Sequence, residues 1–181
     1  MTTINLFVDT EFSNFETHEL ISIALVMDKK KYFYRESLSF EKKICSDFVK
    51  EHVLTLLSDK PVNIAQIKQD LNLWLKSLIC EEIIIVGDYF GDWKILQTLL
   101  DENTKVIGFI QIDDFFTKQI YDKNKDISID KLLKKQEIIL NHFEKTVQDW
   151  FQINNKTAHH ALNDAFSNFD AFHITLALVE S

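Results

Sequence analysis

The stretch Ile4-Asn5-Leu6-Phe7-Val8-Asp9-Thr10-Glu11 begins as an apolar run and ends in two acids. The run predicts a β-strand over residues 4–8. Side chains two residues apart in a strand lie on the same face, so the carboxylates of Asp9 and Glu11 point the same way beside the core. Like charges that close raise the pKa of at least one of them unless a cation lies between them. Mg²⁺ prefers oxygen ligands and would remove this repulsion, but two exposed strand-end acids would give the same pattern.

The rest of the chain alternates between strand and helix patterns. Further strands are predicted at residues 20–27, 32–37, 83–86 and 105–112, and helices at 48–57, 64–78, 92–100, 131–151 and 160–179. Residues 113–130 are polar and their structure stays open. The short lysine-rich turn at 28–31 favours antiparallel pairing of its two strands, whereas the later helical connections favour parallel pairing. The order predicts an α/β fold with a mixed β-sheet flanked by α-helices, in one domain over residues 1–181.

Composition restricts the class of protein. The chain has 181 residues, of which 46% are hydrophobic, so it is long enough to bury a core without disulfides. Cys45 and Cys80 match no zinc or redox spacing, which favours a reducing compartment. The N-terminus has no secretion signal pattern, and no apolar run reaches the ~20 residues of a membrane span. We therefore expect a cytoplasmic protein that does not use a membrane.

The charge balance bears on the substrate. The formal net charge is −8, which argues against holding a long duplex through many phosphate contacts. A short single-stranded end remains compatible with this charge if divalent cations neutralise a cluster of carboxylates.

A second acidic segment, Val86-Gly87-Asp88-Tyr89-Phe90-Gly91-Asp92-Trp93, follows the predicted strand at 83–86 and leads into a helix. Ligand sites in open α/β sheets gather where strands end and helices begin. Asp92 fits such a site, but it also fits an N-cap of the helix. Asp88 is a second acid in the same turn, and spacing alone does not choose between the two.

A third segment, His159-His160-Ala161-Leu162-Asn163-Asp164-Ala165, begins the last predicted helix. Asp164 lies one turn into that helix. The small side chains of Ala161 and Ala165 share a face, which allows the helix to approach the sheet that carries Asp9 closely. A histidine-capped amphipathic helix with a surface aspartate would have the same sequence.

The three segments in this order resemble the motifs of the DEDDh branch of the DEDD 3′–5′ exonucleases. Asp9-Thr10-Glu11 matches the first motif, Asp92 the second, and His159 to Asp164 the third. The likeness is closer to compact bacterial proteins related to mycobacterial 3′–5′ exoribonucleases, through Asp9-Thr10-Glu11-Phe12, Leu20-Ile21-Ser22-Ile23, Cys45-Ser46-Asp47-Phe48-Val49 and His159-His160-Ala161-Leu162. It extends over residues 4–172 and implies an RNase H-like fold. The family often has Asn or His where this chain has Asp88.

The resemblance implies a metal-dependent 3′–5′ exoribonuclease that hydrolyses single-stranded RNA ends to nucleoside 5′-monophosphates. Two divalent cations, Mg²⁺ or Mn²⁺, would serve the reaction. The implied metal ligands are four carboxylates: Asp9, Glu11, Asp92 and Asp164. Asp9 would contact both ions, and His159 would be the general base. Asp88 is a further candidate for binding metal or substrate, and His160 is expected to be structural or solvent-facing.

Several alternatives stay open. Phe12 is expected to stack on a base of the substrate, although core packing is the default role of a phenylalanine. A preference for RNA needs contacts to the 2′-OH that the sequence does not reveal, so a DNA exonuclease of the same superfamily is an alternative. A non-catalytic RNase H-like module that binds nucleic acid or protein is another. Residues 101–155 match no motif, and both a homodimer contact and a cover over the substrate channel are open for them.

Overall fold

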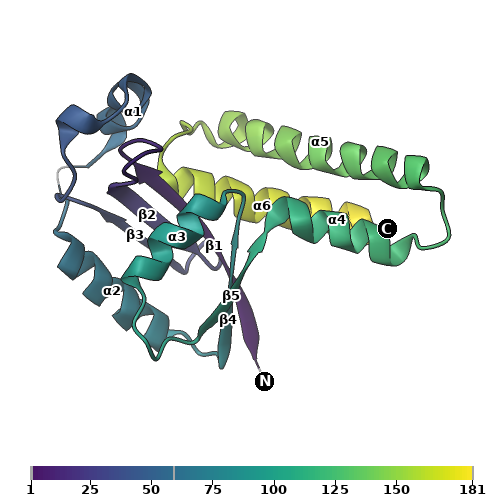
Figure 1. Cartoon of the computed structure of the whole chain (residues 1–181), viewed down its shortest axis with the longest axis horizontal. Helices are drawn as coiled ribbons and strands as arrows, with labels where there is room; N and C mark the ends of the chain where they lie inside the picture. Colours follow the sequence, from purple (N-terminus) through teal and green to yellow (C-terminus); the bar gives the residue numbers. More distant parts are fainter. Residues whose placement is uncertain (1, 59, 181) are drawn as a thin grey trace.

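The computed structural model of the chain describes residues 2–58 and 60–180. In these residues five strands form one sheet in the order β3-β2-β1-β4-β5 (Figure 1). The strands are β1 (Thr3–Phe12), β2 (Leu20–Val26), β3 (Tyr32–Glu36), β4 (Glu82–Gly87) and β5 (Val106–Gln111). The pairs β1–β2 and β2–β3 are antiparallel, whereas β1–β4 and β4–β5 are parallel. The predicted α/β class with a mixed sheet is confirmed.

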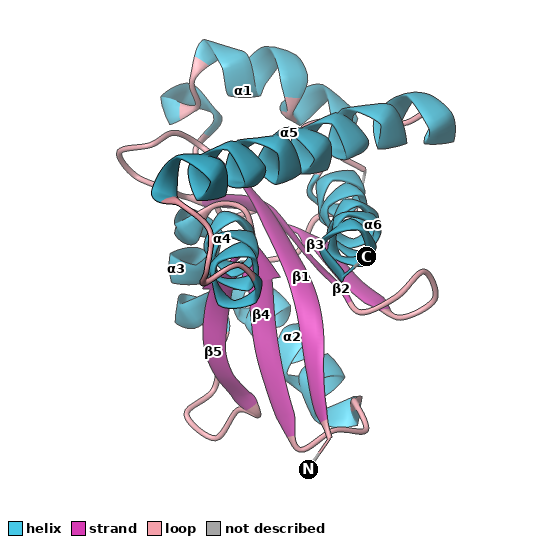
Figure 2. Cartoon of the chain, turned by 90° about the vertical axis from the view of Figure 1, so that its right-hand side faces the viewer, coloured by secondary structure: helices cyan, strands magenta, loops and turns pink. Residues whose placement is uncertain are grey.

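Helices cover both faces of this sheet (Figure 2). They are α1 (Asp47–His52), α2 (Ile64–Ser77), α3 (Phe90–Leu99), α4 (Ile112–Lys123), α5 (Ile129–Asn154) and α6 (Ala161–Glu180). Helices α2 and α3 pack on one face, where Leu6 and Val8 of β1 join their apolar side chains. Helix α6 packs on the other face with α4 and α5 beside it, and Phe7 of β1 belongs to that second core. The central strand therefore contributes alternate side chains to two cores.

Strand β1 is longer than the predicted 4–8 and carries the acidic pair within it. Its antiparallel register with β2 places Asp9 opposite Ala24 and Glu11 opposite Ser22. Because Phe7 faces α6, the alternation of the strand directs Asp9 and Glu11 to the α6 side as well. Thr10, between them, faces the α3 side, where its hydroxyl contacts Asp92.

Two segments differ from the predicted elements. The helix expected over 48–57 ends at His52 and is followed by a 3₁₀ turn at Leu54–Leu56. Ser46 caps α1 by accepting a hydrogen bond from the Val49 N–H. The polar segment that the sequence left open contains α4, which follows β5 directly.

Among the described residues, no helix combines the length and the apolar character that crossing a bilayer requires.

Candidate functional site

Three parts of the fold converge at one cavity of about 270 Å³. They are the end of β1, the corner between β4 and α3, and the beginning of α6, which lies over β1 in Figure 1. The cavity is lined by every site residue that the sequence predicts: Asp9, Glu11, Phe12, Asp88, Asp92, His159 and Asp164. Segments that lie far apart in the sequence thus meet at a single place.

The carboxylates form two groups with one shared member. Oxygen atoms of Asp9, Asp88 and Asp92 all lie within 4.8 Å of one another, and so do oxygen atoms of Asp9, Glu11 and Asp164. Each group offers three oxygen ligands, which is the donor type that Mg²⁺ and Mn²⁺ favour. Asp88, whose role the sequence left open, groups with Asp92. Asp9 lies between the two groups.

Asp92 is placed by the first turn of α3 and by strand β1. It is only 2% exposed, and the Thr10 hydroxyl donates a hydrogen bond of 2.6 Å to its Oδ1. Tyr89 occupies the N-cap position of α3, so the alternative in which Asp92 caps the helix is wrong. Asp92 instead lies within the first turn, with its carboxylate buried toward β1.

Asp164 is placed by the close approach of α6 to the sheet. Ala161 and Ala165 are fully buried against the core that includes Phe7 and Ala24, as the small-residue face predicted. The His160 backbone N–H donates to Asp164 Oδ2 at 2.9 Å, and the His160 carbonyl accepts from the Asp164 N–H at 3.1 Å. These two bonds fix the acid at the start of the helix.

Burial in the shared cavity raises the pKa values of its carboxyl groups. Burial, followed by the charges of Asp164 and Asp92, raises the pKa of Glu11 to about 8. Burial is also the largest cause that raises the pKa values of Asp92 and Asp164 to about 7. The pKa of Asp9 is raised well above its usual value, by burial first and then by four neighbouring acids. A proton bound to one of these carboxylates neutralises its charge and so lowers the repulsion within the cluster. A bound cation would lower the same repulsion.

His159 is the histidine that reaches this cavity. Its backbone has φ 64, an uncommon value for a residue other than glycine, at the bend before α6. Its ring packs edge-on against Phe48 of α1 at 4.8 Å between centroids, with the His52 ring 6.3 Å away. Desolvation lowers the pKa of His159, and a charge on His52 lowers it further. The imidazole is therefore neutral, and able to accept a proton, over a wider pH range than usual.

His160 is turned to the sheet instead. Its ring stacks on Tyr34 of β3 at 4.9 Å and 23° between ring planes, and it does not line the cavity. This is the structural position that the sequence analysis allowed for it.

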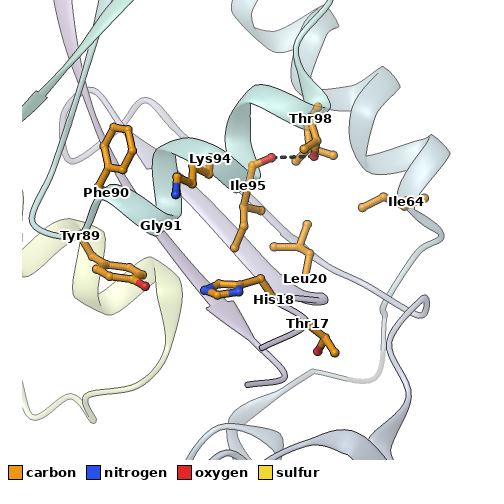
Figure 3. A pocket seen from close by; sticks show the side chains of 11 residues that line it. Thr17, His18, Leu20, Ile64, Tyr89, Phe90, Gly91, Lys94, Ile95 and Thr98 are labelled. Atoms are coloured by element: carbon orange, nitrogen blue, oxygen red, sulfur yellow. Dashed lines mark hydrogen bonds between the residues drawn. The ribbon is translucent and has the colours of Figure 1, made fainter. Parts of the chain in front are cut away.

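Aromatic rings separate the acidic cavity from a second, larger one. Phe12 stacks on His18 at 4.8 Å and on Tyr89 at 6.1 Å between centroids. Beyond Tyr89 lies a mainly apolar cavity of about 690 Å³ between α2, α3 and the segment before β2 (Figure 3). Tyr89 lines both cavities. A Cβ at Gly91 would come within 2.0 Å of the Tyr89 ring, so the missing side chain allows the ring to lie there.

Sequence reasoning missed five residues that line this cavity: Thr10, Tyr89, Val147, Ser167 and Asn168. Thr10 was passed over between two acids, although strand alternation directs it to the opposite side and toward α3. Asn168 lines the cavity beside Asp88, and its spacing of four residues from Asp164 could have placed it on the same face of α6. Tyr89 carried no sequence signal, because its position depends on the space at Gly91.

No protein-family model matches the chain, and no curated protein sequence matches it either. What the site does is therefore inferred from the chemistry of its own residues.

Proposed function

We propose that the protein is a metal-dependent 3′–5′ exonuclease that acts on single-stranded nucleic acid ends, with RNA as its expected substrate. The proposal includes an RNase H-like fold, with which the mixed five-stranded sheet flanked by helices is compatible. The observation that carries it is the pair of three-carboxylate groups that share Asp9. Two cations held by a shared carboxylate are the arrangement used for in-line displacement at phosphorus.

The residues present fit hard divalent cations. The donor atoms are carboxylate oxygens only, which suits Mg²⁺ or Mn²⁺ better than softer metals. Within residues 2–58 and 60–180, none of the five acids forms a salt bridge with a basic side chain. The raised pKa values of four of them have carboxylate neighbours among their causes: Asp9, Glu11, Asp92 and Asp164. A bound cation would replace protons there and remove the repulsion between these groups.

The chain's own residues divide the remaining work. In the proposal, Asp9, Glu11 and Asp164 would hold one cation, and Asp9, Asp88 and Asp92 would hold the other. Bound cations would polarise the attacking water and stabilise the charge on the leaving 3′ oxygen. His159 accepts the proton of that water as general base, because its lowered pKa keeps its ring neutral near pH 7. The Thr10 hydroxyl holds Asp92 in its place.

The neighbouring aromatic rings suit a single-stranded end. Phe12 and Tyr89 both line the cavity, and the Tyr89 ring is 41% exposed, so a base entering beside the acids would meet an aromatic ring. Stacking on an aromatic side chain contributes about 1–3 kcal/mol per base and requires the base to be unpaired. The net charge of −8 agrees with a substrate bound through its end rather than along a long duplex.

A gel time course tests the proposal. The substrates are 5′-labelled single-stranded RNA and DNA of one sequence, incubated with Mn²⁺ or with EDTA. The variants are Asp9→Asn, which changes the shared ligand, and Asp130→Asn, a matched change at an exposed acid of α5. We expect a ladder that shortens from the 3′ end with Mn²⁺ in the wild type and in Asp130→Asn only. Faster cleavage of DNA than of RNA would change the substrate assignment to DNA. No cleavage of either by folded protein would overturn the proposed enzymatic activity and favour a binding module.

A further inference from the structure

A partly buried polar network ties the start of α6 to the edge strand β3. The Tyr34 hydroxyl donates to Glu36 Oε1 at 2.7 Å and lies 3.2 Å from His160 Nε2. Glu36 is 3% exposed, and its carboxylate also accepts from the backbone N–H and the hydroxyl of Ser58. The network therefore runs from the carboxylate of Glu36 to His160, the residue that lies between His159 and the first residue of α6.

The hydrogen bonds in this network have one consistent direction. Tyr34 has one hydroxyl proton, and the short bond to Glu36 uses it. The Tyr34 oxygen must then accept from His160, whose Nε2 carries the proton. Stacking of the two rings at 4.9 Å restrains the imidazole further. His160 is thus held at its ring by Tyr34 and at its backbone by Asp164.

We propose that Tyr34 and His160 are positioning residues that hold Asp164 and His159 in the geometry the acidic cavity requires. The role in metal binding rests on the function proposed above. His160 links two residues of the site, because it follows His159 in the chain and donates its N–H to Asp164 Oδ2. A ring anchored on β3 fixes both neighbours with respect to the sheet that carries Asp9 and Glu11.

The site needs such an anchor for two reasons. His159 has φ 64, and a backbone in that region persists only where its surroundings hold it. Carboxylate oxygens of Asp164, Asp9 and Glu11 also lie within 4.8 Å of one another, and like charges that close repel. Hydrogen-bond partners behind metal ligands commonly restrain them, and their loss costs about 10- to 100-fold in metal affinity or activity.

A double-mutant cycle on Mn²⁺ affinity tests the proposal. Tyr34→Phe and His160→Phe each remove one side of the Tyr34–His160 hydrogen bond while keeping an aromatic ring for stacking. Tyr32→Phe is the matched control, because Tyr32 is on the same strand and 44% exposed. Calorimetric titration of folded full-length protein should show a rise of about tenfold or more in the Mn²⁺ dissociation constant for either variant. The double variant should be no worse than the weaker-binding single variant, because both changes break the same contact.

Backbone amide NMR of the metal-free protein separates this proposal from the function. We expect the amide resonances of His160 and Asp164 to shift in Tyr34→Phe and to stay in place in Tyr32→Phe. If the wild type binds no Mn²⁺, the proposed function fails, and these resonances alone decide the positioning role. Unshifted His160 and Asp164 resonances in Tyr34→Phe would overturn the positioning role. An Mn²⁺ affinity of Tyr34→Phe equal to that of Tyr32→Phe would overturn it too, and so would additive losses of Mn²⁺ affinity in the double variant.

Discussion

Asp9 is the residue on which the proposed chemistry depends most, because it belongs to both carboxylate groups. We expect Asp9→Asn to abolish hydrolysis, since neither cation would keep its shared ligand. The same change should raise the melting temperature of the metal-free protein at pH 8, because it removes one carboxylate from a cluster in which four other acids raise its pKa. For a chain of this length each kcal/mol corresponds to roughly 2–4 °C. Thermal unfolding in EDTA and the cleavage assay measure the two effects.

Asp130→Asn is the control for this prediction, as an exposed acid in the first turn of α5. It should leave both the activity and the melting temperature within error of the wild type. Retained activity in Asp9→Asn, or a lower melting temperature of its metal-free form at pH 8, would contradict the site assignment.

His159 supplies the second prediction at this scale. We expect His159→Ala to lower turnover by about 10²- to 10⁴-fold at saturating Mn²⁺, the usual contribution of a general base, with little change in Mn²⁺ affinity. Because desolvation lowers its pKa, the acid limb of the wild-type pH–rate profile should lie below the ordinary histidine value of 6.5. His173→Ala, an exposed histidine of α6, serves as control. A loss below tenfold in His159→Ala would assign the proton transfer to another group.

At the scale of elements, α6 brings Asp164 to the sheet because its buried face is made of small residues. Ala165 is fully buried between the helix and the sheet. We expect Ala165→Leu to push α6 outward, at a cost of about 1–3 kcal/mol of overpacking. Mn²⁺ binding should also weaken, because the shift of α6 would move the Asp164 carboxylate away from those of Asp9 and Glu11. Ala177→Leu adds the same volume on the exposed face and should change neither the melting temperature nor the Mn²⁺ titration. Undiminished Mn²⁺ affinity in folded Ala165→Leu would show that Asp164 is no ligand.

The corner between β4 and α3 gives a prediction about substrate binding. A Cβ at position 91 would overlap the Tyr89 ring, and that ring is 41% exposed, so it can move aside at small cost in stability. We expect Gly91→Ala to raise KM severalfold while the melting temperature changes little, because the wall between the two cavities would be displaced. Tyr89→Ala should raise KM similarly, and the double variant no further. Steady-state kinetics on short RNA measure this, and fully additive effects would contradict the contact.

The sequence predicted most elements because their patterns are local. The β-branched run at 83–86 lies within β4, and the periodic apolar residues of α2 and α6 mark those helices within a few positions. Helix α4 was missed because it follows β5 without a loop, although Ile112, Phe116 and Ile120 recur at helical spacing and are buried. The end of α1 at His52 was also missed, since Val53 packs with Ile21 and Cys45, and such tertiary contacts override local periodicity.

For the whole molecule, the main result is that motifs distant in sequence lie at one cavity. Their residue patterns and their resemblance to known motifs led to the candidate residues. The structure groups Asp9, Glu11 and Asp164 on one side and Asp9, Asp88 and Asp92 on the other. The sequence could not place Tyr34 or Tyr89, because neither belongs to a motif. Their roles depend on cross-strand register and on the space beside a glycine, which exist only in the folded chain.

The concentration of acids in one cavity also sets how stability depends on pH. Burial and neighbouring acids raise the pKa of Glu11 to about 8 and the pKa values of Asp92 and Asp164 to about 7 in the folded chain, against ordinary values of 4.5 and 3.8. The folded state therefore binds more protons than the unfolded state between about pH 4 and 8. The contribution of these three carboxyl groups to the free energy of unfolding is fully present below about pH 4. It is lost as the pH rises from about 4 to 8. We expect the melting temperature in EDTA to fall between pH 5 and pH 8.5.

Mg²⁺ should reverse this trend, because it binds the ionised carboxylates and competes with protons. At 100 times its dissociation constant a ligand stabilises by about 2.7 kcal/mol, which corresponds to roughly 5–10 °C for this chain length. We expect that increase at pH 8 and little of it at pH 5, where the acids remain protonated. In Asp9→Asn the fall with pH should be shallower and the Mg²⁺ effect absent, since one charge and the shared ligand are gone. Equal Mg²⁺ shifts at the two pH values would place the ion elsewhere on the protein and remove the basis for a two-metal hydrolase.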